Sequence, residues 1–233
     1  MIWVQKEIIK PGKLFPAADV RRDEFDADNQ RILLADERVD IVFLGDSITE
    51  GWDVGREFSD LGSAVNRGIS GDIINVMEKR LAADVLQLEP RVAVINGGVN
   101  NMIPFFEMRE ADFPAAIQEV LTTFVRAYEE IFAACRQAGQ RIVASTITPL
   151  AETPSSPGTQ ARKETAVRMN RQLLELCARY GIPCVDYHTP MAALDGVSVQ
   201  PGLTRDGIHP NEAGYARMAR AIRPVLTAML DLD

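Results

Sequence analysis

The sequence predicts a three-layer α/β/α fold, in which helices cover both faces of a doubly wound parallel sheet of about five strands. Three observations indicate this class. Short segments rich in Val and Ile recur along the chain, each is followed by a longer segment with helical periodicity, and the apolar runs are nearly continuous. Continuous apolar runs are typical of parallel strands buried on both faces, and a repeated strand–helix order indicates a parallel sheet.

Five apolar segments with turn residues at their ends are the predicted strands. They are residues 39–45, 63–68, 91–97, 141–147 and 182–187, and the second has the weakest pattern. The predicted helices are residues 72–87, about 112–138, 161–180 and 211–229. In the second helix apolar residues recur every three or four positions, and Gly139 ends it. Pro224 is expected to bend or divide the last helix.

Two regions fall outside this alternation. Residues 1–38 precede the first strand and are rich in mixed charges, so we expect an N-terminal extension that packs on the domain as a solvated helix or a wrapping arm. Residues 39–233 then form the domain itself. Residues 149–160 contain three prolines and one glycine, which predicts a loop. Because this loop follows the fourth strand, it should border the ligand crevice at the carboxyl edge of the sheet.

The composition narrows the classes of function. The chain has 233 residues, of which 46% are hydrophobic and 25% are charged, as in a soluble globular protein. A net charge of −8 argues against nucleic acid or an anionic membrane surface as the main partner. No apolar run is long enough to span a bilayer, and the N-terminal stretch does not have the features of a signal peptide.

The sequence contains none of the common motifs for disulfide, metal or nucleotide-binding sites. The three cysteines form no CxxC pair, which predicts thiols in a reducing compartment and therefore a cytoplasmic location. They are Cys135, Cys177 and Cys184. We expect no metal, since no His/Cys cluster has ligand spacing. We expect no cofactor either, because no GxGxxG or P-loop motif supports the alternative of a flavin- or nucleotide-binding protein.

The stretch FLGDSITEGWD, residues 43–53, raises the question of what Ser47 does. It follows the first predicted strand at the point where a helix would begin. One interpretation is structural: Ser47 and Glu50 have the spacing of a capping box. The other is that Ser47 is a nucleophile, since ligands bind at the carboxyl ends of parallel strands.

Other polar residues should gather at the same edge of the sheet. They lie in the segments NRGISGD, GGVNN and DGIHPNEAGY. Taken singly each has a structural interpretation: Asp206 in a turn, Asn211 as a helix cap, and His209 as a surface residue. Together they match acyl transfer, which needs a hydroxyl, a base, a carboxylate that orients the base, and donors for an oxyanion. His188, the other histidine, has no comparable context and is expected to be structural.

The segments GDSITEG, NRGISGD, GGVNN and DGIHPN, in this order, resemble the four sequence blocks of the GDSL or SGNH hydrolase superfamily. The blocks run from residue 45 to residue 211. The resemblance implies a flavodoxin-like sheet and ester hydrolysis through a serine nucleophile. It places the four residues that give the superfamily its name on Ser47, Gly71, Asn100 and His209, with Asp206 completing a triad.

The roles follow from the chemistry. Ser47 would attack an ester carbonyl, His209 would take its proton, and Asp206 would orient the histidine. The oxyanion would bind to the backbone amides of Ser47 and Gly71 and to the side chain of Asn100. Gly71 is preferred to Gly68 because it precedes the acidic position of its block. Many family members have an acid where this chain has Asn101, and the change leaves the Asn100 donor intact.

The substrate is less well defined by the sequence. The resemblance allows carbohydrate O-acetyl esters and other small esters, which we favour, and also lysophospholipids and thioesters; an inactive carbohydrate-binding relative is a further alternative. Met102 and Phe105 follow Asn100 and could line an acyl site or simply pack in the core. Asp46 is a further candidate for substrate binding. The expected partner is a small-molecule or carbohydrate ester, and a homo-oligomer is left open.

Overall fold

The computed structural model describes residues 8–10, 20–151 and 156–231. At its centre is a five-stranded parallel sheet with the order β2-β1-β3-β4-β5. The strands are β1 Ile41–Gly45, β2 Ala64–Gly68, β3 Val92–Asn96, β4 Ile142–Ser145 and β5 Cys184–Val185. All five overlap the predicted strands, and the parallel sheet confirms the predicted class.

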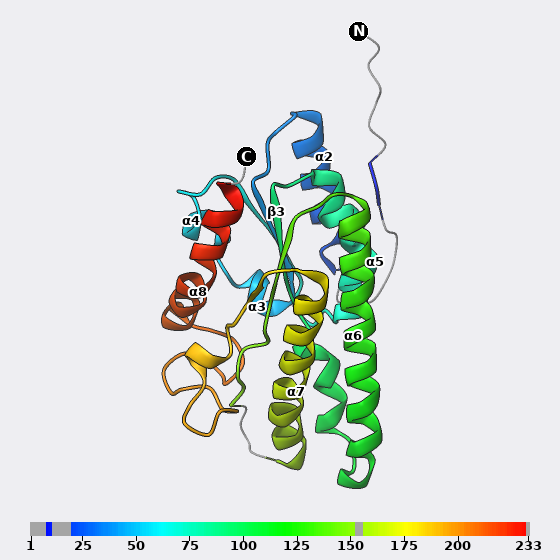
Figure 1. Ribbon diagram of the computed structural model, residues 1–233, viewed down its shortest axis with the longest axis vertical. Helices are drawn as coiled ribbons and strands as arrows, with labels where there is room; N and C mark the ends of the chain where they lie inside the picture. The colour runs from blue at the N-terminus through cyan, green and yellow to red at the C-terminus, as the bar shows by residue number, and fades with distance from the viewer. Residues whose placement is uncertain (1–7, 11–19, 152–155, 232–233) are drawn as a thin grey trace.

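Helices flank both faces of this sheet (Figure 1). The α-helices are α2 Arg22–Leu34, α3 Ser47–Glu50, α4 Val54–Glu57, α5 Ile74–Asp84, α6 Phe113–Gln137, α7 Pro157–Tyr180 and α8 Glu212–Leu230. The 3-10 helices are η1 Leu86–Leu88, η2 Val99–Phe106, η3 Glu110–Asp112 and η4 Thr189–Met191. Figure 1 shows α5, α6 and α7 on one side of the sheet and α8 with α4 on the other, which makes three layers.

The register of the central strands places their carboxyl ends level with one another. Gly45 at the end of β1 pairs with Gly68 at the end of β2 and with Asn96 at the end of β3. The chain turns to β2 on one side of β1 and to β3 on the other, so the strand order reverses here. Open α/β sheets bind ligands at such a reversal point. The residues that follow these three strand ends therefore lie at the same edge of the sheet.

Prolines in two helices, α7 and α8, act differently from the prediction. Helix α7 begins at Pro157, so the prediction of a loop is wrong for residues 157–160; residues 152–155 lie outside the described residues. Ser156 and Thr159 form a capping box there, and Pro157 occupies the first helical turn, where a missing N–H costs nothing. Helix α8 runs from Glu212 to Leu230 with Pro224 inside it, so of the two effects expected of Pro224, division of the helix does not occur.

Helix α2 shows that the charged N-terminal region is more than a solvated face. Its apolar residues Phe25 and Ile32 are buried, as expected for a helix packed on the domain. Its polar residues Arg22, Asp26 and Asn29 are buried as well, which the charge pattern did not predict. They are tolerated because they pair with partners on α5 and β2, as described below. The division of the chain at residue 38 remains a prediction.

Candidate active site

Three side chains form a hydrogen-bonded chain at the carboxyl edge of the sheet. The Nε2 atom of His209 lies 2.9 Å from Oγ of Ser47. The Nδ1 atom of the same ring lies 2.6 Å from Oδ2 of Asp206. An ionised carboxylate can only accept a hydrogen bond, so Nδ1 donates its hydrogen to Asp206, and in the neutral ring Nε2 has its lone pair toward the serine hydroxyl. This is the arrangement in which a histidine can take a proton from serine.

The turn that carries Asp206 and His209 is stabilised from within. Oδ1 of Asp206 accepts hydrogen bonds from the amides of Ile208 and His209, at 3.0 and 2.8 Å. Partial burial acts to raise the pKa of Asp206, but these two amides and the histidine ring outweigh it and lower the pKa to about 2. The carboxylate is therefore ionised at neutral pH. The side chain of Asp206 is 53% exposed and that of His209 is 38% exposed, so the pair faces solvent.

Asp46, and not Ser47, caps the short helix α3. Its carboxylate accepts a hydrogen bond from the Ile48 amide, and the side chain is 1% exposed. Of the two interpretations of Ser47, the capping one is therefore wrong, since Ser47 occupies the first helical position and its hydroxyl is directed to His209. The predicted capping partner Glu50 instead accepts from the amide of Ser70. Burial raises the pKa of Asp46 to about 7.

The backbone amides of Ser47 and Gly71, which follow the ends of β1 and β2, are available as hydrogen-bond donors. The amide of Ser47 is at a helix start, where N–H groups lack helical partners. Gly71 has φ of +80°, a conformation that glycine adopts readily. Within the described part of the chain, neither amide has a hydrogen-bond acceptor. The amide of Gly68 donates to Asn66 at 2.8 Å and is thus occupied, which agrees with the choice of Gly71.

Asn100 and Asn101 have different surroundings. Nδ2 of Asn100 donates to the carbonyl of Asp72 at 2.9 Å, which holds its amide beside the residue that follows Gly71. Oδ1 of Asn101 accepts from the amide of Ile74 at 3.1 Å, at the start of α5. A carboxylate could accept the same hydrogen bond. Asn101 therefore ties η2 to α5, a role that the sequence alone did not indicate.

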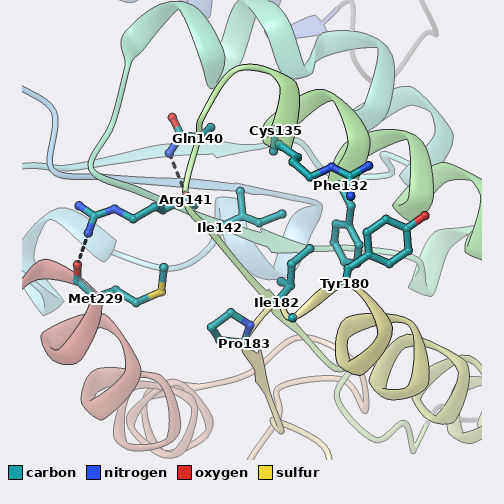
Figure 2. A pocket seen from close by; sticks show the side chains of 11 residues that line it. Phe132, Cys135, Gln140, Arg141, Ile142, Tyr180, Ile182, Pro183 and Met229 are labelled. Carbon is teal, nitrogen blue, oxygen red and sulfur yellow. Dashed lines mark hydrogen bonds between the residues drawn. The ribbon is translucent and has the colours of Figure 1, made fainter. Parts of the chain in front are cut away.

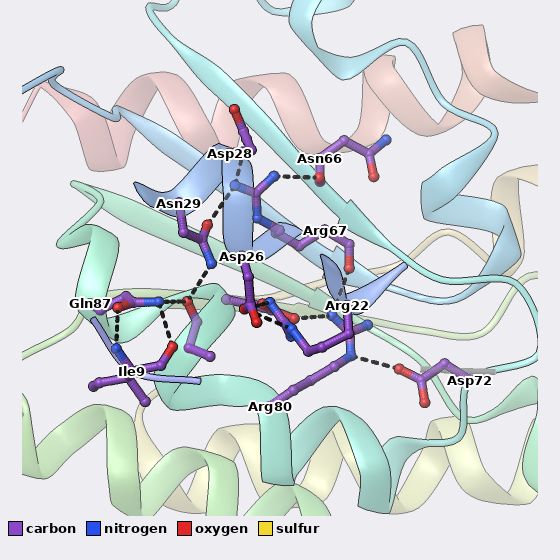
Figure 3. A network of polar contacts seen from close by, with 12 residues as sticks. Ile9, Arg22, Asp26, Asp28, Asn29, Asn66, Arg67, Asp72, Arg80 and Gln87 are labelled. Carbon is purple, nitrogen blue, oxygen red and sulfur yellow. Dashed lines mark hydrogen bonds and ion pairs between the residues drawn. The ribbon is translucent and has the colours of Figure 1, made fainter. Parts of the chain in front are cut away.

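A network of buried charged side chains lies beside the loop that connects β2 to α5 (Figure 3). Arg80 of α5 is fully buried and donates to Asp72 and Asp84 at 2.7 Å each. It also donates to the carbonyls of Gly45 and Arg67, at the ends of β1 and β2. These contacts were missed from the sequence. A signal was present, because Arg80 and Asp84 fall at helical spacing on the same face as buried apolar residues of α5.

Helix α2 supplies further members of this network. Arg22 donates to Asp84 at 2.7 Å and to Asp26 at 2.8 Å. Arg67 of β2 donates to Asp28 and Asn29, both at 2.7 Å. Burial lowers the pKa of Arg67, and burial raises the pKa of Asp72 although Arg80 opposes that shift.

The structure places the three substrate-binding candidates in the interior. Met102 and Phe105 are 0% and 1% exposed and belong to the hydrophobic core, as in the packing interpretation of this segment. Asp46 is equally buried. Their neighbours Ile103 and Phe106 are each 47% exposed and face outward.

The remaining polar candidates have structural partners. Both ring nitrogens of His188 lie within hydrogen-bond distance of backbone carbonyls, Ile147 at 3.2 Å and Gly196 at 2.9 Å. Asn211 caps α8 through the amide of Gly214. The three cysteines are free thiols. Among the residues that the structure describes, no group of His, Cys, Asp and Glu side chains could hold a metal ion.

A well-formed cavity of about 240 Å³ lies at the opposite, amino-terminal edge of the sheet (Figure 2). Its lining includes Phe132, Cys135, Ile142 and Tyr180. Burial raises the pKa of Cys135 to about 12, so the thiol is not a ready nucleophile, and the lining contains no histidine. We therefore assign the candidate active site to the Ser47 cluster and not to this cavity.

Fold and geometry together define a class of protein: an α/β fold with a Ser–His–Asp cluster at the carboxyl edge of a parallel sheet. The model of the GDSL-like Lipase/Acylhydrolase family matches residues 43–217. The chain therefore belongs to this family. The search among curated proteins gave no significant match.

Solved structures share the fold. A proposed acylhydrolase from Bacteroides fragilis is 24% identical with a TM-score of 0.73, and the alignment covers 93% of this chain and 100% of that chain. A GDSL-like lipase from Bacteroides thetaiotaomicron has the same identity and TM-score, with coverage of 88% and 97%. An acetyl-xylooligosaccharide esterase from Geobacillus stearothermophilus is 19% identical with a TM-score of 0.62, covering 81% and 94%. In the described ranges, no helix is both long and apolar enough to cross a bilayer.

Proposed function

We propose that the protein is a serine ester hydrolase in which Ser47, His209 and Asp206 form the catalytic triad. The observation that carries this proposal is the hydrogen-bonded chain from Asp206 through His209 to the Ser47 hydroxyl, at 2.6 and 2.9 Å. The family to which the chain belongs is consistent with it.

The proposed reaction has two stages. Oγ of Ser47 attacks the ester carbonyl carbon while Nε2 of His209 takes the hydroxyl proton. The protonated histidine then gives this proton to the leaving alcohol, and an acyl-enzyme remains. Water attacks the acyl-enzyme, His209 takes a proton from the water, and the carboxylic acid leaves as Ser47 regains its hydrogen. Asp206 remains ionised throughout and stabilises the imidazolium.

The developing oxyanion is bound by three donors in this proposal. They are the amides of Ser47 and Gly71 and the side-chain amide of Asn100. The proposal is supported by the two backbone amides that lack acceptors in the described part of the chain, and by the hydrogen bond that holds Asn100 beside Asp72. Each such donor typically contributes about 3–4 kcal/mol to transition-state stabilisation.

The substrate that we favour carries a short acyl group on a bulky alcohol, such as an O-acetyl group on a carbohydrate. Asp206 and His209 face solvent, which leaves room for a large leaving group. Met102 is packed in the core and does not line the cavity between η2 and α6, which supports a short acyl group. The fold neighbour that acts on acetyl-xylooligosaccharides fits the same substrate class.

The test is an ester panel. Hydrolysis of nitrophenyl esters from acetate to laurate, and acetate release from an acetylated xylo-oligosaccharide, should show highest kcat/KM for the acetyl compounds. Ser47→Ala should abolish turnover while circular dichroism remains native. Full activity in folded Ser47→Ala would contradict the proposal, and a folded wild type inactive on every ester would favour a binding protein with a vestigial triad.

A second candidate is hydrolysis of longer acyl esters, as in a lysophospholipase or thioesterase. A cavity of about 220 Å³ lies between η2 and α6, lined in part by Asn101, Phe105 and Met108. It adjoins the segment that carries Asn100. Met108→Trp should narrow this cavity, so a selective loss of laurate hydrolysis in that variant would favour the longer-chain alternative.

We also propose that the protein works in the cytoplasm. Support comes from its free cysteines, of which Cys135 and Cys177 are buried. Fractionation of the source cells, with detection of the protein by antibody, tests this location.

A further inference from the structure

The loop Gly68–Asp72, which carries the Gly71 amide, is held from outside by helix α2. Nη1 of Arg21, at the start of that helix, donates to the carbonyl of Gly68 at 2.9 Å. The same nitrogen lies 3.3 Å from a carboxylate oxygen of Glu50. The other oxygen of Glu50 accepts from the amide of Ser70 at 2.5 Å. Arg21 therefore reaches the loop both directly and through Glu50.

The guanidinium of Arg21 is itself oriented by its neighbours on α2. Nε and Nη2 donate to the two carboxylate oxygens of Glu24, at 2.9 and 2.6 Å, in a bidentate pair. The group also stacks over the ring of Phe25, with 4.7 Å from Cζ to the ring centroid. A guanidinium held on these sides can fix the position of a carbonyl oxygen.

Gly71 lies between two residues whose positions are set by charged side chains. On one side, the Ser70 amide is bound by Glu50. On the other side, the Asp72 carboxylate is bound by Arg80 at 2.7 Å. Since glycine adds no side chain that could anchor the turn, the direction of the Gly71 N–H depends on these two neighbours. The Arg80 contact is fully buried, whereas the side chains of Arg21 and Glu50 are 23% and 31% exposed.

We propose that Arg21 is a positioning residue for the oxyanion hole, acting through the Gly68 carbonyl and through Glu50. The inference rests on the proposed function, because it assigns a purpose to the Gly71 amide. It gives helix α2 a role in catalysis, although that helix precedes residues 43–217, the range matched by the family model. The plain alternative is that Arg21 only attaches α2 to the domain.

The test compares Arg21→Ala with Arg31→Ala. Arg31 lies on the same helix and forms ion pairs with Asp28 and Glu37, so it is a matched control. In Arg21→Ala we expect kcat for nitrophenyl acetate to fall about tenfold with KM unchanged, since a misplaced donor weakens binding of the transition state more than of the substrate. In Arg31→Ala both constants should remain at wild-type values. Arg21→Lys should recover part of kcat, because the lysine ammonium group can bind either the Gly68 carbonyl oxygen or the Glu50 carboxylate.

A second measurement does not depend on activity. Hydrogen exchange of the peptide that spans residues 68–73, followed by mass spectrometry, should be faster in Arg21→Ala and unchanged in Arg31→Ala. Combining Arg21→Ala with Asn100→Ala should give less than the product of the two losses, because both act on one oxyanion hole. If Arg21→Ala does not fold, Arg21→Lys and Glu50→Gln take its place in both measurements.

Three results would overturn the inference: wild-type kcat in folded Arg21→Ala, an equal loss in Arg31→Ala, or losses that multiply with Asn100→Ala. Failure of the proposed function is recognised separately. Turnover in folded Ser47→Ala would remove the proposed function itself, whereas an inactive Ser47→Ala together with wild-type kcat in Arg21→Ala would remove only the positioning role.

Discussion

The Asp206–His209 turn and the Gly68–Asp72 loop both contact helix α3, and they are held by different kinds of contact. The turn is held by its own backbone amides, which bind Asp206. The loop is held by charged side chains from α2, α3 and α5, of which Arg80 is fully buried. One half of the site is exposed and local, and the other is partly buried and assembled from distant elements.

This difference indicates where each half is vulnerable. An exposed turn with internal hydrogen bonds can be changed without disturbing the domain, so substitutions there should act on chemistry. A buried ion-pair network tolerates the loss of one partner badly, because the remaining charge is left in the interior. Substitutions in the buried network that contacts the Gly68–Asp72 loop should therefore lower both the free energy of unfolding and the rate of the reaction.

The largest expected effect is on the exposed half. His209→Ala should lower kcat/KM by a factor on the order of 10⁴ or more, because Ser47 and His209 act as one unit. The double variant with Ser47→Ala should lose no more than either alone. The free energy of unfolding, from urea denaturation, should remain near the wild-type value. Multiplicative losses would mean that the two residues act independently.

The buried half is tested by Arg80→Met, which leaves Asp72 and Asp84 without their buried partner. The free energy of unfolding should fall by about 3–5 kcal/mol. Arg31→Ala, which removes two ion pairs at the surface, should change it by no more than about 0.5 kcal/mol. Urea unfolding followed by circular dichroism gives both values. A loss of the same size in the two variants would contradict the network.

Asn100→Ala sharpens the comparison within the proposed oxyanion hole. It should lower kcat by about 10²–10³ with similar KM, because this donor acts chiefly when charge develops on the substrate oxygen. Asn101→Asp is the matched control: it keeps an acceptor for the Ile74 amide and should leave kcat unchanged. Steady-state kinetics on both variants measures kcat and KM and so tests this prediction. A raised KM with kcat intact would make Asn100 a substrate-binding residue.

The smallest expected effect concerns Asp46, between the two halves. Burial raises its pKa to about 7 from an ordinary 3.8, so the native state holds the proton more tightly than the unfolded chain. Stability is therefore lost as pH rises from about 4 to about 7, and the whole cost is present above that range. Asp46→Asn does not titrate and keeps an oxygen for the Ile48 amide.

The stability advantage of the variant over wild type should accordingly grow by about 2–3 kcal/mol between pH 5 and pH 8, because wild type loses stability over this range and the variant does not titrate there. Urea unfolding at both pH values measures this. Asp53→Asn, which replaces an exposed aspartate at the cap of α4, is the matched control. An equal stability difference at both pH values would show that the charge on Asp46 is not the cause.

The sequence predicted the parallel sheet and the residues that gather at its carboxyl edge, because both depend on local patterns. Apolar runs such as residues 39–45 identify a buried strand without knowledge of its neighbours. The Asp206–His209 pair was equally accessible, since its members are three residues apart and bind within one turn. The start of α7 was missed because prolines and a glycine suggested a loop, although Ser156 and Thr159 carry a capping box.

Only the tertiary structure decided how the other half is held. Arg21 and the Gly68 carbonyl are 47 residues apart in the chain, Arg22 and Asp84 are 62 apart, and Arg80 and the Gly45 carbonyl are 35 apart. A charged residue on a helix is expected to be exposed to solvent when its partner is not known. A charge is buried only where another element supplies a partner for it, and the sequence of the helix does not show that partner. The sequence by itself thus identified His209 and Asp206 as the partners of Ser47, and the packing of α2 and α5 against the sheet determined what holds the Gly68–Asp72 loop.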